Sequence, residues 1–297
     1  MTMIQDIYPS RQAPEPGTAA RQDPVVWGTA EAGPLSADEL EFFDRQGYLW
    51  FPGIVGADEV TALKAELDRL WGVHADDRTD EVIREPSSDE IRSIFRIHET
   101  SPVMRRLIAD PRLAGRARQI LGSRVYVHQS RINYKPGFRG KEFYWHSDFE
   151  TWHVEDGLPR MRALSCAIAL SENTLFNGPV MIVPGSHRTY VQCVGETPDK
   201  HYRESLRAQR YGVPDDDSLQ RLVDEHGIEM PTGPAGSVLF FDCNLMHGSN
   251  SNISPYARSN VFTVYNSVEN TPVRAFGPSE LRPHFLGSRD FTPTDEY

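Results

Sequence analysis

Apolar residues in the first two-fifths of the chain recur at helical spacing. One helix is predicted after Ser36 and a second from about Asp58, whose apolar face gathers Val60, Leu63, Leu67 and Leu70. Capping signals mark where helices begin and end: the capping box Ser36-x-x-Glu39, then Ser101-Pro102, Asp110-Pro111 and the stop signal Gly122. We therefore expect residues 35–122 to form a mainly helical support.

Beyond Gly122 the pattern changes to short runs rich in β-branched and aromatic residues, separated by Gly, Pro and Asn. Five such runs predict strands, at residues 124–134, 163–170, 179–183, 237–242 and 258–266. Strands that close on themselves give a jelly-roll barrel, with the earlier helices packed on its outer face. The predicted fold class is therefore α+β with a mainly β core.

Two segments depart from this pattern. Residues 1–34 contain five prolines and little apolar periodicity, which predicts an extended arm on the surface or a partly disordered one. Residues 190–234 form a polar stretch too long for an ordinary connection, so that a mobile lid and a solvated acidic loop fit about equally well. We expect a single domain over residues 35–297, with the jelly-roll core at about 123–270.

The composition narrows the class of protein. Of 297 residues 39% are hydrophobic, enough for a core, and 31 basic against 42 acidic residues give a net charge of −11. This charge opposes binding to nucleic acid or anionic lipid. Cys166, Cys193 and Cys243 form no CxxC pair, which argues against a disulfide framework or a zinc ribbon. No apolar run suits a signal peptide or a membrane span, and we expect a cytoplasmic protein.

The candidate chemistry centres on His146-x-Asp148. In an extended strand residues i and i+2 point to the same face, so both side chains could reach one metal ion. The best third ligand is His247, 247 − 148 = 99 residues later and just after an apolar strand. Two imidazoles and one carboxylate on one face of Fe(II) leave three positions open, as binding of a bidentate oxo-acid together with O₂ requires.

An arginine downstream strengthens this interpretation, because His-x-Asp alone is a weak motif. Arg258 follows His247 by 258 − 247 = 11 residues, after a turn-forming stretch, and opens a new strand. Its planar guanidinium could bind the distal carboxylate of 2-oxoglutarate through two hydrogen bonds. The alternative for Arg258 is a surface ion pair.

The sequence resembles the phytanoyl-CoA-dioxygenase-like superfamily through His146-x-Asp148, the turns at residues 177–179 and 184–187, and His247 with Arg258. This resemblance implies a double-stranded β-helix. Within the superfamily, residues 143–159 resemble the signature stretch of ectoine hydroxylases, and the similarity extends over nearly the whole chain. It implies hydroxylation of L-ectoine to 5-hydroxyectoine, with 2-oxoglutarate converted to succinate and CO₂, in the synthesis of a compatible solute under osmotic or heat stress by a homodimer.

The resemblance also implies binding residues on the strand 129–135, whose odd-numbered positions share one face. Lys135 and Asn133 would then contact 2-oxoglutarate, and Gln129 the substrate. Lys135 as an exposed strand-end lysine and Gln129 as a satisfied core amide are the alternatives. An inward lysine is costly unless it is paired with an anion.

Further substrate contacts implied by the resemblance are Thr151, Trp152 and Arg282. Trp152 could stack on a cationic ring, although core packing is the commoner role of a tryptophan. Arg282 would bind the substrate carboxylate. Ala167 stands where the family more often has serine, and we expect His187 to lie in a tight turn outside the metal ligands.

Competing functions stay open at this point. The same oxygenase chemistry could act on another small amino-acid-like or acyl substrate. A halogenase is a poorer fit, because Asp148 occupies the position that a halide needs. A metal-binding jelly-roll protein without catalysis, or a zinc hydrolase that uses the same ligands, would leave Arg258 and Lys135 without a purpose.

Overall fold

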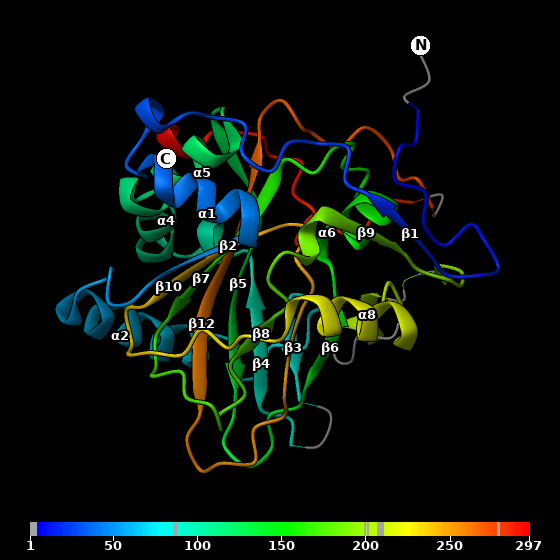
Figure 1. The fold of residues 1–297 in the computed structure, drawn as a ribbon. Coiled ribbons are helices and arrows are strands. Elements are labelled where there is room, and N and C mark those ends of the chain that lie inside the picture. The colour runs from blue at the N-terminus through cyan, green and yellow to red at the C-terminus, as the bar shows by residue number, and fades with distance from the viewer. Residues whose placement is uncertain (1–4, 86–87, 199, 201, 207–210, 278–279) are drawn as a thin grey trace.

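The computed structural model describes residues 5–85, 88–198, 200, 202–206, 211–277 and 280–297 (Figure 1). Its largest element is a seven-stranded antiparallel sheet in the order β2-β10-β7-β12-β5-β4-β3. In that order the strands are Tyr48–Phe51, Val238–Asp242, Ala163–Ala169, Arg258–Ser267, Val125–Lys135, Ile91–Phe95 and Val82–Arg84. The five predicted strands are confirmed, four of them in this sheet, whereas β2, β3 and β4 are too short to give a period-2 signal.

A second, three-stranded sheet has the order β6-β11-β8, formed by Phe143–His146, His247–Ser249 and Val180–Ile182. It packs on the inner face of the large sheet, where Val180 and Ile182 contact Ala167, Leu239 and Phe241. Two facing antiparallel sheets joined in this way form the predicted jelly roll. The cavity described below opens between them.

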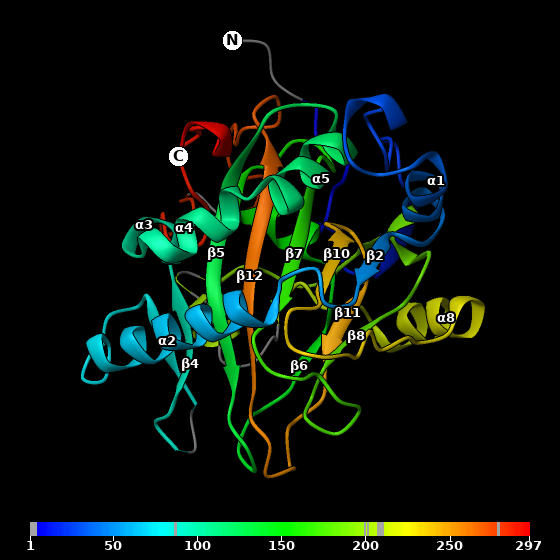
Figure 2. The ribbon, with the colours of Figure 1, turned by 90° about the vertical axis from the view of Figure 1, so that its left-hand side faces the viewer.

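Helices cover the outer face of the large sheet (Figure 2). They are α1 Ala37–Gln46, α2 Ala57–Val73, α3 Ile97–Thr100, α4 Pro102–Ala109 and α5 Pro111–Leu121. Their apolar faces and the outward residues of the sheet, among them Cys166, Ile168 and Phe240, form the largest buried cluster. The predicted capping box of α1, the caps of α4 and α5, and the left-handed Gly122 are all confirmed.

The N-terminal arm lies along the barrel rather than free of it. β1 (Gly17–Ala20) pairs with β9 (Thr189–Gln192) in a separate two-stranded sheet (Figure 1). Tyr8 of the arm is fully buried, and its hydroxyl donates to Asp23 over 3.0 Å. The arm ends in a short 3-10 turn, η1 (Ala30–Ala32). Its largely extended course agrees with its many prolines.

The remaining elements surround the cavity. A short helix α6 (Asp148–Thr151) continues into a π-helix (Trp152–Asp156), and η3 (Ser186–Arg188) and η4 (Thr294–Glu296) are 3-10 turns. Within residues 190–234 lie the end of β9, α7 (Tyr202–Ser205) and α8 (Asp216–His226), while residues 199, 201 and 207–210 are outside the described part. In the described part of the chain, no helix is both long and apolar enough to span a bilayer.

Candidate metal centre

Three metal-ligand side chains meet where the small sheet ends. His146 is the last residue of β6, Asp148 the first of α6, and His247 the first of β11. Their ligand atoms all lie within 4.8 Å of one another, the only such group in the described part of the chain. Asp148 Oδ1 is 3.8 Å from His146 Nε2, and its Oδ2 is 3.9 Å from His247 Nε2.

The geometry that joins these residues differs from the predicted one. His146 and Asp148 do not share a strand, because β6 ends at His146 and the chain turns at Ser147 into a helix. The expectation of an i, i+2 pair on one strand is therefore wrong, although the residues do converge. Antiparallel pairing of β6 with β11 sets His146 directly opposite His247, with 4.3 Å between the ring centroids. The turn then brings the Asp148 carboxylate to both imidazoles.

Hydrogen bonds orient each ligand. His146 Nδ1 lies 2.7 Å from the carbonyl oxygen of Tyr144, and His247 Nδ1 lies 3.0 Å from that of Leu245. A ring nitrogen that donates to a carbonyl leaves the Nε2 lone pair free for a metal. Burial, with a smaller effect of His247, lowers the pKa of His146 to about 4, so its imidazole is neutral at pH 7. Neutral imidazoles and a carboxylate fit Fe(II).

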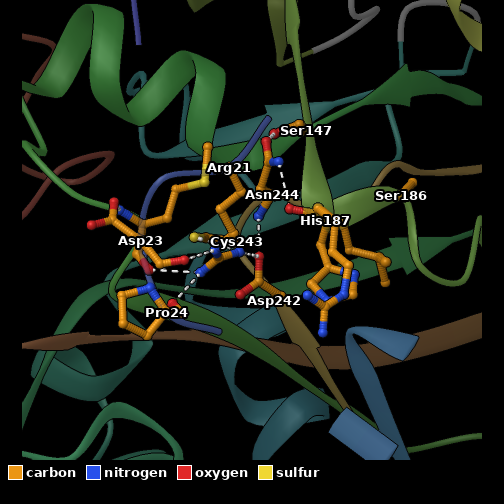
Figure 3. A network of polar contacts seen from close by, with 12 residues as sticks. Arg21, Asp23, Pro24, Ser147, Ser186, His187, Asp242, Cys243 and Asn244 are labelled. Atoms are coloured by element: carbon orange, nitrogen blue, oxygen red, sulfur yellow. Dashed lines mark hydrogen bonds and ion pairs between the residues drawn. The ribbon is translucent and has the colours of Figure 1, made fainter. Parts of the chain in front are cut away.

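A network of polar contacts supports the turn between the ligands (Figure 3). Ser147 Oγ donates to Asn244 Oδ1 over 2.9 Å, and the Asn244 amide nitrogen donates to the His187 carbonyl over 2.9 Å. The Asn244 backbone N–H donates to Asp242, which pairs with Arg21 of the N-terminal arm at 2.7 Å. His187 itself lies 3.0 Å from the carbonyl of Asp44 through Nε2, which confirms its place outside the ligands.

The ligands open into a cavity that is partly open to solvent. Six further residues singled out in the sequence line its wall: Gln129, Asn133, Thr151, Trp152, Arg258 and Arg282. They come from β5, the helix after β6, β12 and the C-terminal segment, so the fold gathers residues more than 150 positions apart, such as Gln129 and Arg282.

One end of the cavity carries positive charge without a matching protein anion. Arg258 is buried, its Nη2 donates to Asn133 Oδ1 at 2.5 Å, and its Nε and Nη1 have no hydrogen-bond partner among the described residues. Burial, and then the nearby Arg92 and Arg131, lower the pKa of Arg258 to about 9. Two buried donors without acceptors are costly, so they indicate a site for an anion.

Arg131 is a cavity residue that the sequence analysis missed. It stands between Gln129 and Asn133 on the same face of β5, so the odd-numbered pattern contained the signal. Its guanidinium lies 5.3 Å from the ring of Phe262, and burial lowers its pKa. Other lining residues were not predicted either: Phe143, Phe262, Tyr202 and Ser205 of α7, and Leu206 directly after it.

Lys135 does not line the cavity, contrary to the expectation that it would share the wall with Gln129 and Asn133. It is the last residue of β5, and its ammonium turns to Ser249 Oγ at 2.8 Å and the Asn250 carbonyl at 2.6 Å. Burial, followed by repulsion from Arg258, lowers its pKa well below the ordinary value. Ser249, which Lys135 contacts, does line the cavity, so Lys135 reaches the cavity wall only through Ser249.

The opposite wall suits a zwitterionic ligand. Arg282 binds Asp156 in a bidentate pair at 2.8 and 2.5 Å, and His128 also contacts Asp156 at 3.0 Å. Burial alone would lower the pKa of Arg282, but Asp156 raises it above its ordinary value. Gln129 donates to the Leu286 carbonyl at 2.8 Å, so that its own oxygen is left to accept. Trp152 closes this wall and is only 3% exposed.

Ala167, which replaces the serine more common in the family, packs with Leu239 and Phe241 between the sheets and does not line the cavity. A serine hydroxyl nearer the metal comes from Ser165, two residues earlier on β7. It donates to Asp148 Oδ2 over 3.0 Å and so helps to orient this carboxylate.

Comparison with known proteins agrees with this site. Residues 43–260 match the phytanoyl-CoA dioxygenase family. The chain is 56% identical over 287 residues to the ectoine dioxygenase of Sphingopyxis alaskensis, covering 96% of this chain and 94% of that one. It is 57% identical over 289 residues to that of Bordetella bronchiseptica, with 96% and 93% covered.

Solved structures agree as well. A crystal structure of EctD from S. alaskensis with 2-oxoglutarate and 5-hydroxyectoine superposes with a TM-score of 0.87 at 52% identity, covering 96% of this chain and 95% of that one. The α-ketoglutarate-dependent carbocyclase SnoK, at 23% identity and a TM-score of 0.61 over 82% of this chain and 89% of that one, shares the fold.

The geometry predicts one tightly bound Fe(II) per chain, lost in His146→Ala, Asp148→Ala and His247→Ala. Two remaining ligands hold the ion poorly, and we expect affinity to fall by at least about tenfold. Anaerobic titration followed by metal analysis measures this, with circular dichroism to verify the fold. His226→Ala, at a partly exposed histidine of α8, serves as the control and should bind normally. Normal iron content in any of the three variants would show that its residue is not a ligand.

Proposed function

The chain belongs to the phytanoyl-CoA dioxygenase family, and from this premise we propose that it hydroxylates L-ectoine to 5-hydroxyectoine with 2-oxoglutarate and O₂. One oxygen atom enters the ectoine ring, the other enters succinate, and CO₂ leaves. The observation that carries the proposal is the His146, Asp148 and His247 group, which opens into one cavity with the unpaired guanidinium donors of Arg258.

Three protein side chains would hold the metal ion and leave its other positions to small ligands. His146, Asp148 and His247 would hold Fe(II) through the two Nε2 atoms and one carboxylate oxygen. Fe(II), when bound, supplies the binding of the oxo-acid and the activation of O₂ at its open positions. Ser165 and the backbone carbonyls behind the imidazoles keep the three ligands oriented.

2-Oxoglutarate lies, in our proposal, between the metal and Arg258. Its distal carboxylate would accept from Nε and Nη1 of Arg258, the two donors without partners, while Asn133 holds Nη2 in place. Arg131 adds a second positive charge on the same wall. Lys135 would act through Ser249 rather than by touching the cosubstrate. A dianion is the ligand that best compensates the buried positive charge at this end.

L-Ectoine is small and zwitterionic, which suits the other wall. Its delocalised cationic ring would lie against Trp152, with Thr151 beside it, and Gln129 would accept from a ring N–H. Its carboxylate would bind Arg282, which Asp156 already fixes on one side. These contacts aim one ring carbon at the metal, and such positioning decides which C–H bond reacts.

The segment after β9 would cover the cavity. Tyr202 and Ser205 line it from α7, and Leu206 lines it from the turn that follows. Tyr202 packs against Phe285 in an apolar cluster that also contains Leu286. We propose that this part of residues 190–234 moves as a lid, because entry and release of a buried ligand require an opening.

We further propose that the protein is a cytoplasmic homodimer that serves the osmotic or heat stress response. Three free, buried cysteines suit a reducing compartment. Neighbouring loops at one end of the barrel expose a cluster of large apolar side chains, here called the apolar end: Phe138, Leu175, Phe176, Ile253 and Tyr256. Exposed apolar clusters of this kind are typical of protein interfaces.

Product analysis tests the function. Purified protein loaded anaerobically with Fe(II) and exposed to O₂ is offered ectoine, proline or a branched acyl-CoA, and succinate and oxygenated product are followed by mass spectrometry. We expect ectoine to gain one oxygen atom with one succinate formed. If only proline or the acyl-CoA gave an oxygenated product, the assignment as an oxygenase would stand and the assignment of ectoine as substrate would be wrong. Turnover with zinc in place of iron and O₂ would indicate a hydrolase.

Arg258→Ala should chiefly raise the requirement for 2-oxoglutarate. A charge-assisted hydrogen-bonded pair contributes about 1.5–3 kcal/mol, or roughly ten- to a hundredfold in KM. Arg258→Lys should restore only part of the affinity, because an ammonium cannot make the bidentate contact. Steady-state kinetics with 2-oxoglutarate varied at saturating ectoine measures the effect. A raised KM for ectoine with that for 2-oxoglutarate unchanged would contradict the assignment.

Trp152→Ala should weaken ectoine-coupled turnover more than it weakens binding of iron or 2-oxoglutarate. Stacking of a cation on an indole contributes about 0.5–2 kcal/mol, and Trp152→Phe should retain part of it. The measurement is KM for ectoine together with the ratio of hydroxylated product to succinate. An equal weakening of the binding of ectoine and of 2-oxoglutarate would indicate a general packing defect.

Replacing Phe138 and Ile253 by serine should shift the protein from dimer to monomer, because both belong to the apolar end. Light scattering after size exclusion measures the mass. Val73→Ser, at a similarly exposed apolar residue of α2, is the matched control and should leave the dimer intact. A monomeric wild-type protein would refute the dimer, and a dimeric double variant would place the interface elsewhere.

A further inference from the structure

One wall of the cavity is a helix that changes from α-helical to π-helical hydrogen bonding along its length. Residues Asp148–Thr151 are α-helical and Trp152–Asp156 form a π-helix, so the proposed metal ligand Asp148 and the cavity residues Thr151 and Trp152 all belong to one short segment. A π-turn pairs residues five apart in place of four and is rare, usually requiring support from outside the helix. We call residues 148–156 the wall helix.

The N-terminal arm supplies such support. Asp6 contacts His153 Nε2 at 3.0 Å, Tyr8 packs edge-on against Phe149 with centroids 5.3 Å apart, and Ser10 donates to Glu150 over 2.7 Å. Residues 6–10 of the arm therefore contact both the α-helical and the π-helical part of the wall helix. The wall-helix residues that the arm contacts here do not line the cavity, whereas Asp148, Thr151 and Trp152 do.

Arg11 makes the strongest of these contacts. It binds Glu150 in a bidentate pair, with Nη2 at 2.7 Å and Nε at 3.0 Å, and Glu155 through Nη1 at 2.7 Å. All three side chains are at most 3% exposed. Burial alone would lower the pKa of Arg11, but Glu150, and then Glu155, raise it above its ordinary value, so the guanidinium stays charged.

The spacing of the two glutamates is what links this ion pair to the register. Glu150, in the α-helical part, and Glu155, in the π-helical part, are five residues apart, and the extra residue in a π-turn brings such residues closer to the same side of the helix. In a regular α-helix side chains four apart are stacked, and residues five apart diverge. A single planar guanidinium can therefore bridge Glu150 and Glu155 in the π register but not readily in the α register.

We propose that Arg11 is a positioning residue, which holds the wall helix in its π register and so aims Trp152 and Thr151 into the substrate cavity. This proposal rests on the proposed function, since it concerns the substrate side of the same site. The N-terminal arm is then part of the active site, although none of its residues lines the cavity among those described.

Arg11 also protects the pairing of Arg282. Glu155 Oε2 lies 3.9 Å from Arg282 Nε, while Arg282 is bound by Asp156. With Arg11 removed, Glu155 would lose its 2.7 Å ion pair, and its attraction for Arg282 at 3.9 Å would gain in weight. A guanidinium drawn toward Glu155 is drawn away from the cavity. Loss of Arg11 should thus affect both the ring contact and the carboxylate contact of ectoine.

The test compares Arg11→Lys, Glu155→Gln and the triple variant Arg11→Met, Glu150→Gln, Glu155→Gln, which removes the ion pairs without leaving a buried unpaired charge. In each, KM for ectoine should rise roughly ten- to a hundredfold, since small misplacements of positioning groups have effects of this size. The ratio of hydroxylated product to succinate should fall. Iron affinity and KM for 2-oxoglutarate should change by less than about twofold, because Arg258 and the metal ligands do not touch the arm.

A second readout does not depend on the substrate. Amide hydrogen exchange of residues 149–158 in the iron-free protein should accelerate in all three variants, while exchange in β5 and β12 stays as in the wild type. Leu63→Ala, in the core on the far side of the sheet, is the control for lost stability and should alter neither the coupling ratio nor this local exchange at a matched loss of Tm.

The outcomes separate the two proposals. Unchanged exchange in the wall helix, or unchanged KM for ectoine with unchanged coupling, would overturn the role of Arg11. Equal effects in Leu63→Ala would also overturn it, because the defect would then be general. Failure of the wild type to hydroxylate ectoine would instead refute the proposed function, and the exchange experiment would still decide whether Arg11 holds the wall helix.

Discussion

The antiparallel pairing of β6 with β11 is the interaction on which the site depends. It joins His146 to His247 across 247 − 146 = 101 residues and sets their rings 4.3 Å apart. Two strands of four and three residues are not stable alone in water. They persist because β8 completes their sheet and packs Val180 and Ile182 against the large sheet. The metal ligands are thus only as well ordered as the apolar contact between the two sheets, which in turn needs the helical layer behind the large one.

Within this frame the charges divide the cavity into two halves. Arg258 and Arg131 leave positive charge uncompensated at one end, whereas Arg282 at the other is bound by Asp156. A dianion therefore gains most beside Arg258, and a zwitterion with a single carboxylate fits beside Arg282. The order of the two organic ligands around the metal follows from this difference in pairing rather than from cavity shape. Exchanging them would bring the dianion to Arg282, which Asp156 already pairs, and would leave only one carboxylate for Arg258 and Arg131.

Local signals in the sequence predicted much of this structure. Caps such as Ser36 and Gly122 act within a single helix, and the apolar runs at β5, β7, β10 and β12 reveal strands whose two faces are buried. His146, Asp148 and His247 were found by residue type, yet the expected strand geometry was wrong because the turn at Ser147 depends on Asn244, 97 residues away. Arg131 was missed, and Lys135 was misplaced on the cavity wall, because strand alternation does not tell where a strand leaves the barrel.

The wall helix has two functions, since it carries the proposed metal ligand Asp148 and the substrate contacts Thr151 and Trp152. These two functions depend on different distant contacts. Asp148 is held by Ser165 of β7, and the turn before it by Asn244, whose neighbour Asp242 pairs with Arg21 of the arm. Trp152 and Thr151 depend in addition on Arg11, which lies 144 residues from Glu155 and reaches it only when the arm has packed on the finished barrel. A chain that has lost only the Arg11 contacts would keep iron and 2-oxoglutarate while losing its hold on the substrate, which makes uncoupled oxidation of the cosubstrate the expected defect.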